Sequence, residues 1–176
     1  MRILCLLLLL VSLPQVWGCA SYGIYEDKRM VGTISSDKAI ATDVKTTLMG
    51  QDFSKGWDIS VYCYYGKVYL VGEVPQNMHN KAVSLARKCK GVRSVTPHWF
   101  AARTADSSDL ALATKLRSNL ISTKGLSSTR IDTQVNANRV VLLGVVNDSR
   151  EKDLAVKIAK QTEGVREVTS YLMLPQ

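Results

Sequence analysis

Residues 67–74 read KVYLVGEV, and residues 139–146 repeat the same apolar pattern as RVVLLGVV. The residues before and after this segment align with the second half of the chain in the same way. The offset between the aligned residues is 72 up to Val146 and 73 beyond Val146. The match is too long and ordered to arise by chance, and it indicates two copies of one structural unit. The aligned pairs include Ser35-Ser36-Asp37 with Ser107-Ser108-Asp109, Ile59 with Ile131, and Gly91-Val92 with Gly164-Val165.

Each copy begins with a predicted helix, followed by a predicted hairpin. The hairpin's first strand alternates apolar Ile59, Val61 and Cys63 with polar residues, the period of a half-buried strand. Gly66 and Asn138 occupy the same turn position, and both tolerate the positive φ of a tight hairpin. In the first copy the apolar stripe of the helix is Ile40, Val44 and Leu48, and Ser36 or Asp37 can cap its start. In the second copy the stripe is Leu112, Leu116 and Leu120, and the cap is Ser108 or Asp109.

The rest of each copy predicts a second helix and a third strand. Gly91 and Gly164 stand where the second helix of each copy is predicted to end, and glycine is common as the residue just after a helix. Pro97 places the third strand of the first copy at an edge of the sheet or interrupts it. Gly72 and Gly144 indicate a bulge or a close approach by a helix. The sequence therefore predicts an α+β protein of two tandem αββαβ modules, each a three-stranded mixed sheet packed against two helices.

The N-terminus has the layout of a signal peptide over residues 1–18. Met1-Arg2 precedes an apolar run about half as long as the roughly 20 residues of a membrane-spanning helix. Val16, Gly18 and Cys19 resemble the processing site of bacterial lipoproteins, at which the cysteine is lipidated. The alternative is ordinary cleavage after Gly18, with an unmodified Cys19.

That resemblance implies acyl chains, palmitate among them, on Cys19, and no other cofactor. Several acyl chains anchor a protein stably, whereas one chain holds it only marginally. Ala20 stands where aspartate would retain a Gram-negative lipoprotein at the inner membrane. The sorting rule then implies the outer membrane, with the protein facing the periplasm and residues 19–34 serving as a lipidated linker.

Two cysteines remain, Cys63 and Cys89, once Cys5 leaves with the signal peptide and Cys19 is lipidated. Helix and strand periodicity turn both side chains toward the core. An oxidising compartment permits a disulfide between them. Two separately buried thiols are an equally open alternative.

The segments that recur in both copies are the strands at 67–74 and 139–146 and the helix exits GVRSV at 91–95 and GVREV at 164–168. These segments and the αββαβ order resemble the BON (bacterial OsmY and nodulation) family. The resemblance covers nearly all of the chain after Ser35, as one BON domain at residues 35–103 and a second at 105–175. With Cys19, the chain resembles the dual-BON outer-membrane lipoproteins, a group associated with cell division and outer-membrane stress.

The resemblance implies binding of anionic phospholipid and a role in envelope integrity, through the exposed side of the second module's first helix. Lys115 and Arg117 can meet a phosphate headgroup, and each basic residue contributes about 1 kcal/mol near an anionic surface. The alternative is a solvated helix face without a ligand. The implied lipid-binding residues are Ala111, Thr114, Lys115, Arg117, Ser118 and Asn119.

The chain departs from the family at one of these positions. Family members often carry tryptophan where this chain has Ala111, and tryptophan favours the headgroup level of a membrane. The departure predicts either a weaker lipid contact or one in which Leu110 and Ile121 take part of the place of the aromatic ring.

Charge and motifs favour binding over catalysis. The formal charge of +8 favours anionic partners, and the export signal argues against nucleic acid. His79 and His98 lie in no metal-ligand spacing, and we expect neither a metal nor an enzymatic activity. The alternative function is a periplasmic protein-interaction or chaperone-like factor for envelope assembly, with envelope proteins bound at apolar patches around Tyr62, Tyr64 or Trp99.

Overall fold

The computed structural model describes residue 29 and residues 31–101 and 108–176, which form two units that we call module 1 and module 2. The predicted signal peptide and the lipidation site Cys19 lie outside the described residues. Module 1 contains α3 (Val31–Gln51), α4 (Phe53–Trp57), β1 (Ile59–Tyr64), β2 (Lys67–Gly72), α5 (Gln76–Lys88) and β3 (Ser94–Trp99). Module 2 contains α6 (Ser108–Ser122), the 3-10 helix η1 (Ser128–Arg130), β4 (Ile131–Asn136), β5 (Arg139–Val145), α7 (Ser149–Gln161) and β6 (Glu167–Met173).

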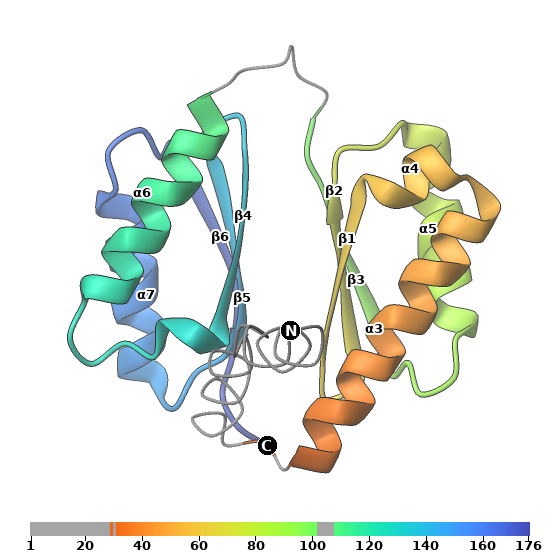
Figure 1. Ribbon diagram of the computed structural model, residues 1–176, viewed down its shortest axis with the longest axis horizontal. Helices are drawn as coiled ribbons and strands as arrows, with labels where there is room; N and C mark the ends of the chain where they lie inside the picture. Colours follow the sequence, from red (N-terminus) through yellow and green to blue (C-terminus); the bar gives the residue numbers. More distant parts are fainter. Residues whose placement is uncertain (1–28, 30, 102–107) are drawn as a thin grey trace, which may run out of the picture.

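Each module is a three-stranded sheet with its two long helices on one face (Figure 1). The middle strand, β2 or β5, pairs antiparallel with the strand before it and parallel with the strand after it. Pro97 lies in the edge strand β3, opposite Leu70 of β2, where only one side of the strand is paired. The predicted α+β class and mixed αββαβ modules are confirmed.

Helix α3 begins at Val31, before the boundary that the sequence predicts for the first domain at residue 35. The last four residues of the predicted linker at 19–34 therefore belong to α3. The cause is an apolar stripe that extends further toward the N-terminus than the predicted stripe, because Ile34 is buried on the same side of the helix as Val44.

The two hairpin turns use positive φ, as predicted. Gly66 has φ 73° and Asn138 has φ 64°, and the residues before them, Tyr65 and Ala137, have φ 55° and 49°. Two successive positive values are typical of the type I′ turn, whose twist matches that of the paired strands.

Gly72 and Gly144 do mark a close approach, but the approaching group is backbone and not the predicted helix. A Cβ on Gly72 would clash with the carbonyl oxygen of Asp58, and one on Gly144 would clash with that of Arg130. Both carbonyls belong to the residue just before the neighbouring strand. The glycines therefore let the chain enter the sheet beside the middle strand.

Gly91 and Gly164 have positive φ, 85° and 95°, but they are not the residues that directly follow a helix end. Helix α5 ends at Lys88, and Gly91 lies in the turn that the Val92 N–H closes on the Cys89 carbonyl at 3.3 Å. The prediction was right about the backbone conformation and wrong about its position.

The two modules pack sheet against sheet, with the long helices on the outside (Figure 1). Across this contact the Tyr64 hydroxyl donates to Asp132 Oδ2 at 2.6 Å, and the Asn136 amide donates to Glu73 Oε2 at 2.8 Å. The side chains buried together between the sheets are Tyr64, Tyr69, Val71, Phe100, Val141, Leu143 and Val145.

This packing turns inward two of the three residues predicted as apolar patches for protein partners. Tyr64 is only 5% exposed, and the Tyr62 hydroxyl accepts a hydrogen bond from Gln134. Trp99 lies apart from this contact, partly buried against the core of module 1, where its ring stacks on His79 with 5.0 Å between ring centroids. The sheet faces are therefore occupied by the partner module.

Candidate functional site

The outer side of α6 is exposed, as the sequence predicts. Its inward side chains Leu116 and Leu120 are fully buried, whereas Leu110 is 79% and Ile121 is 60% exposed. Two large apolar side chains thus stand near the two ends of one helix face, with short and charged residues between them. The exposed members of the predicted set are Ala111, Thr114, Lys115 and Ser118.

Lys115 forms an ion pair on this face. Its ammonium lies 2.7 Å from Glu163 Oε2, and the hydrogen bond lowers the pKa of Glu163. About half of the Lys115 side chain is exposed, and exposed pairs of this kind contribute little to stability. The ammonium can therefore exchange Glu163 for another anion at small cost.

Arg117 and Asn119 do not belong to the exposed face, although the sequence predicts both as lipid-binding residues. The Arg117 guanidinium donates to the carbonyls of Ser128 and Ile131, both at 2.9 Å, and the Asn119 amide donates to the Thr162 hydroxyl at 3.0 Å. A long arginine side chain can reach around a helix, so the direction of its Cα–Cβ bond does not fix the position of its charge.

The repeat itself carries the signal that could have assigned Arg117 correctly. At an offset of 72 residues Arg117 aligns with Lys45, whose ammonium donates to the carbonyls of Gly56, Trp57 and Ile59. Both cations therefore hold the segment that leads into the first strand of their module.

Asp37 and Asp109 have a role that the sequence analysis missed, because it considered them only as helix caps. Both carboxylates are buried, and they accept hydrogen bonds from the amides of the hairpin turn. Asp37 accepts from Tyr65 N and Gly66 N, both at 2.8 Å, and Asp109 accepts from the equivalent turn in module 2. The Ser-Ser-Asp repeat thus marks a bond that ties the first helix to the hairpin.

Cys63 and Cys89 are free thiols in the structure, so the disulfide is not formed. The Cys63 thiol donates to Asp37 at 3.4 Å, whereas the Cys89 thiol donates to the Thr47 hydroxyl at 3.6 Å. Asp37 and Thr47 are ten residues apart on α3, about 15 Å along its axis. The two thiols therefore lie toward different parts of the helix.

We expect both thiols to be titratable without reductant in the denatured mature chain that carries Cys19→Ser. In the folded protein Cys63 should react far more slowly than Cys89, because burial and nearby Asp37 raise the pKa of Cys63 to about 12. Maleimide labelling read by mass spectrometry measures both. Denatured chains without a reactive thiol would contradict this prediction and would instead indicate a disulfide between Cys63 and Cys89.

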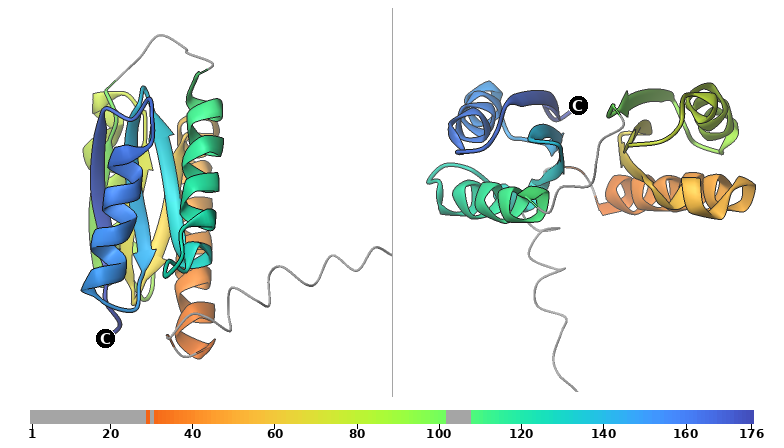
Figure 2. Two further views of the ribbon diagram at one scale, coloured as in Figure 1. Left: turned by 90° about the vertical axis from the view of Figure 1, so that its left-hand side faces the viewer. Right: turned by 90° about the horizontal axis from the view of Figure 1, so that it is seen from above.

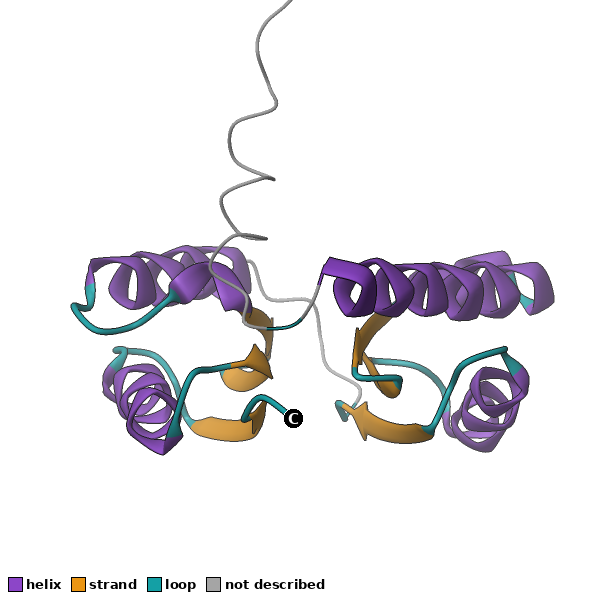
Figure 3. Cartoon of the chain, turned by 90° about the horizontal axis from the view of Figure 1, so that it is seen from below, coloured by secondary structure: helices purple, strands orange, loops and turns teal. Residues whose placement is uncertain are grey.

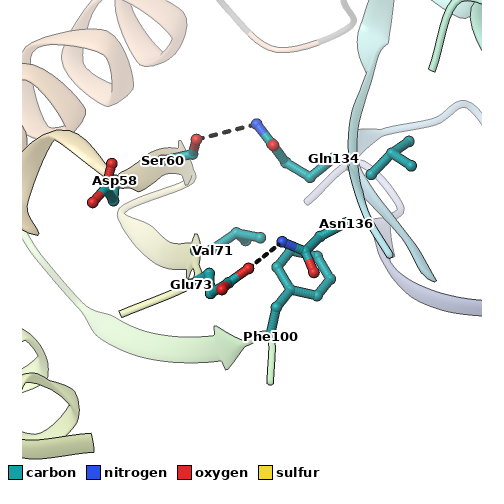
Figure 4. Close-up of a pocket in the computed structure, with 9 residues that line it drawn as sticks. Asp58, Ser60, Val71, Glu73, Phe100, Gln134 and Asn136 are labelled. Carbon is teal, nitrogen blue, oxygen red and sulfur yellow. Dashed lines mark hydrogen bonds between the residues drawn. The ribbon is translucent and has the colours of Figure 1, made fainter. Parts of the chain in front are cut away.

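A cavity of about 390 Å³ opens between the modules and is lined mainly by polar groups (Figure 4). Gln134 donates to Ser60 across it at 3.1 Å, and Asn136 bridges to Glu73. These bonds hold the two sheets in register. The charged side chains that line the cavity are the carboxylates of Asp58 and Glu73, so its lining contains no basic group that would attract an anion.

Among the described residues, no group of three or more His, Cys, Asp or Glu side chains could hold a metal ion. In the same part of the chain, no helix has both the length and the apolar character that crossing a bilayer requires.

The duplicated αββαβ fold, with its sheets paired and its helices outside, defines a class of proteins built from two small tandem modules. Both modules match the BON domain, at residues 36–98 and 108–174. The chain therefore belongs to the BON family.

The chain is 30% identical over 149 residues to osmotically-inducible protein Y of Escherichia coli (strain K12), covering 81% of this chain and 74% of that protein. It is 36% identical over 62 residues to the outer membrane lipoprotein DolP of Haemophilus influenzae, covering 35% of this chain and 32% of that protein. Among solved structures it is similar to the C-terminal domain of CdsD, a type III secretion structural protein of Chlamydia trachomatis. That similarity has a TM-score of 0.34 and 14% identity, and it covers 80% of this chain and 67% of that one.

Proposed function

We propose that this protein is a non-enzymatic outer-membrane lipoprotein that binds anionic phospholipid through the outer side of α6 and supports envelope integrity. Acyl chains on Cys19 anchor it, and it faces the periplasm. The similarity to DolP, whose name describes an outer membrane lipoprotein, supports this location. The observation that carries the proposal is the exposed pair Leu110 and Ile121 on the same helix as Lys115.

The α6 face combines the two contributions that interfacial binding needs. Removing Leu110 and Ile121 from water yields up to about 1.5–3 kcal/mol for each side chain that is fully buried. Lys115 adds about 1 kcal/mol at an anionic surface. The Cys19 anchor makes this contact intramolecular, so a weak intrinsic affinity is sufficient for lasting contact.

The alternative, a periplasmic protein-interaction or chaperone-like factor, has less support from the fold. Tyr62, Tyr64 and Trp99, the residues predicted to receive a protein partner, are held in contacts within the protein. A protein partner would have to bind the helical exterior instead.

Lys115→Glu is expected to weaken binding to phosphatidylglycerol vesicles by roughly 10- to 30-fold. The substitution removes one attraction of about 1 kcal/mol and adds a repulsion of similar size. Cosedimentation of the mature chain carrying Cys19→Ser, at low and moderate salt, measures the change without the acyl anchor. Binding to neutral vesicles should be weak in both proteins.

Lys157→Glu is the matched control for this experiment. Lys157 is an exposed lysine on α7, the other long helix of module 2, so its reversal changes the net charge of the protein by the same amount. Equal losses from both substitutions would contradict a site on α6 and indicate attraction by net charge alone.

A further inference from the structure

The first helices of the two modules, α3 and α6, form one side of the molecule. In Figure 2, seen from above, they lie in one row, and α5 and α7 lie in a second row behind them. Figure 3 shows the same two rows from below. Because the sheets between them are joined by buried aromatic side chains and cross-module hydrogen bonds, the α3 and α6 row is a single surface.

Module 1 adds an element to this side that module 2 does not have. Helix α4 follows α3 directly, and its last residue is Trp57, whose side chain is 65% exposed. The repeat aligns Trp57 with Thr129 in η1, so the aromatic ring is a property of module 1 alone.

The ring is held in a fixed place beside α3. The Lys45 ammonium lies 5.6 Å from the centroid of the Trp57 ring and bonds the Trp57 carbonyl at 2.8 Å. Gly56 packs so closely on the backbone of Leu48 that an added Cβ would lie 2.6 Å from it. The indole is therefore presented by a rigid support.

The position of Lys45 relates Trp57 to the face on α6. Lys45 is the counterpart of Arg117, which lies on α6 between the exposed Leu110 and Ile121. Since Trp57 contacts Lys45 of α3, and α3 and α6 lie in one row, Trp57 lies beside the row that also carries the α6 face.

We propose that Trp57 is a second membrane contact, which acts together with the α6 face so that the row of α3 and α6 lies flat on the bilayer. This inference rests on the proposed function. A bilayer is the occupant that fits, because it is flat and wide enough to touch both modules at once. The indole, apolar with one polar N–H, favours the headgroup region, and Lys55 of the same short helix, whose exposed ion pair with Asp52 is 2.9 Å long, can exchange that carboxylate for a phosphate oxygen there.

Tryptophan fluorescence can test this contact. After removal of the signal peptide with Trp17, the remaining tryptophans are Trp57 and Trp99, and Trp99 is stacked on His79 in module 1. In the mature chain with Cys19→Ser, Trp99→Phe leaves Trp57 as the sole fluorophore, and Trp57→Phe leaves Trp99.

With phosphatidylglycerol vesicles we expect the emission of Trp57 to shift to the blue and its quenching by acrylamide to fall at least twofold, while the emission of Trp99 stays unchanged. Trp57→Ala should also lower vesicle affinity about 5- to 10-fold. Vesicle binding that is sensitive to Lys115→Glu, with no change at Trp57, would overturn the second contact and leave the proposed function intact. Absence of any cosedimentation would overturn both.

Discussion

Replacing Glu151 with alanine is expected to lower the free energy of unfolding by about 3–5 kcal/mol, because it leaves a buried arginine without its counter-ion. The Arg130 and Glu151 side chains are 2% and 4% exposed, with 3.0 Å between Nη2 and Oε1. Glu151 also accepts the backbone amides of Ser127 and Asn147, at 2.7 and 2.6 Å. Urea unfolding followed by circular dichroism measures the loss.

The double variant Arg130→Met with Glu151→Leu separates the charge from the packing. With no unpaired ion, it should be more stable than Glu151→Ala, although the two amides still lack their acceptor. Asp153→Ala, an exposed position on the same helix, should change stability by less than about 0.5 kcal/mol. A double variant no more stable than the single one would show that the ion pair is not the source of the effect.

Asp37→Ala is expected to cost about 3 kcal/mol of unfolding free energy. The carboxylate is 3% exposed, and its removal leaves the Tyr65 and Gly66 amides of the hairpin turn without their acceptor. It also removes one ion pair of the Arg29 guanidinium, which lies 2.7 Å from Asp37 Oδ2. The same urea experiment measures this loss.

Asp37→Asn tests whether the charge or the shape of the side chain matters. Its amide keeps one oxygen acceptor, so the loss should lie between zero and that of alanine. Asp43→Ala, at an exposed position of α3, is the matched control and should have a small effect. An alanine variant at residue 37 that loses less than about 1 kcal/mol would contradict the proposed bond between helix and hairpin.

The sheet-to-sheet packing has a consequence for function, because it decides which surfaces remain available. The tyrosine-rich sheet faces close on each other, and His98 lies in the contact with its pKa lowered by burial. The helical exterior is left for partners. The proposed lipid contact on α6 and the second contact at Trp57 both use that exterior.

The sequence predicted the two long helices and three strands of each module because local periodicity encodes them and both copies carry the same pattern, whereas the short α4 and η1 were not predicted. Leu116 and Leu120 are buried at helical spacing, and the positive φ of Gly66 and Asn138 follows from the turn chemistry of those residue types. The missed roles of Arg117, Asn119 and Asp37 involve side chains whose partners are distant in sequence. Arg117 reaches Ile131, and Asp37 reaches Gly66, at separations of 14 and 29 residues.

The sequence by itself determined the α+β class, the two modules, the order of their elements and the inward stripe of each first helix, since these depend on spacing along the chain. Only the tertiary structure decided that the sheets pack face to face, that Cys63 and Cys89 bond different partners, and that α3 and α6 share one side. The alternation of apolar and polar residues in β1 predicts that its sheet has two different faces, but it does not predict which part of the protein covers the second face. That choice depends on the fit of side chains brought together from both modules.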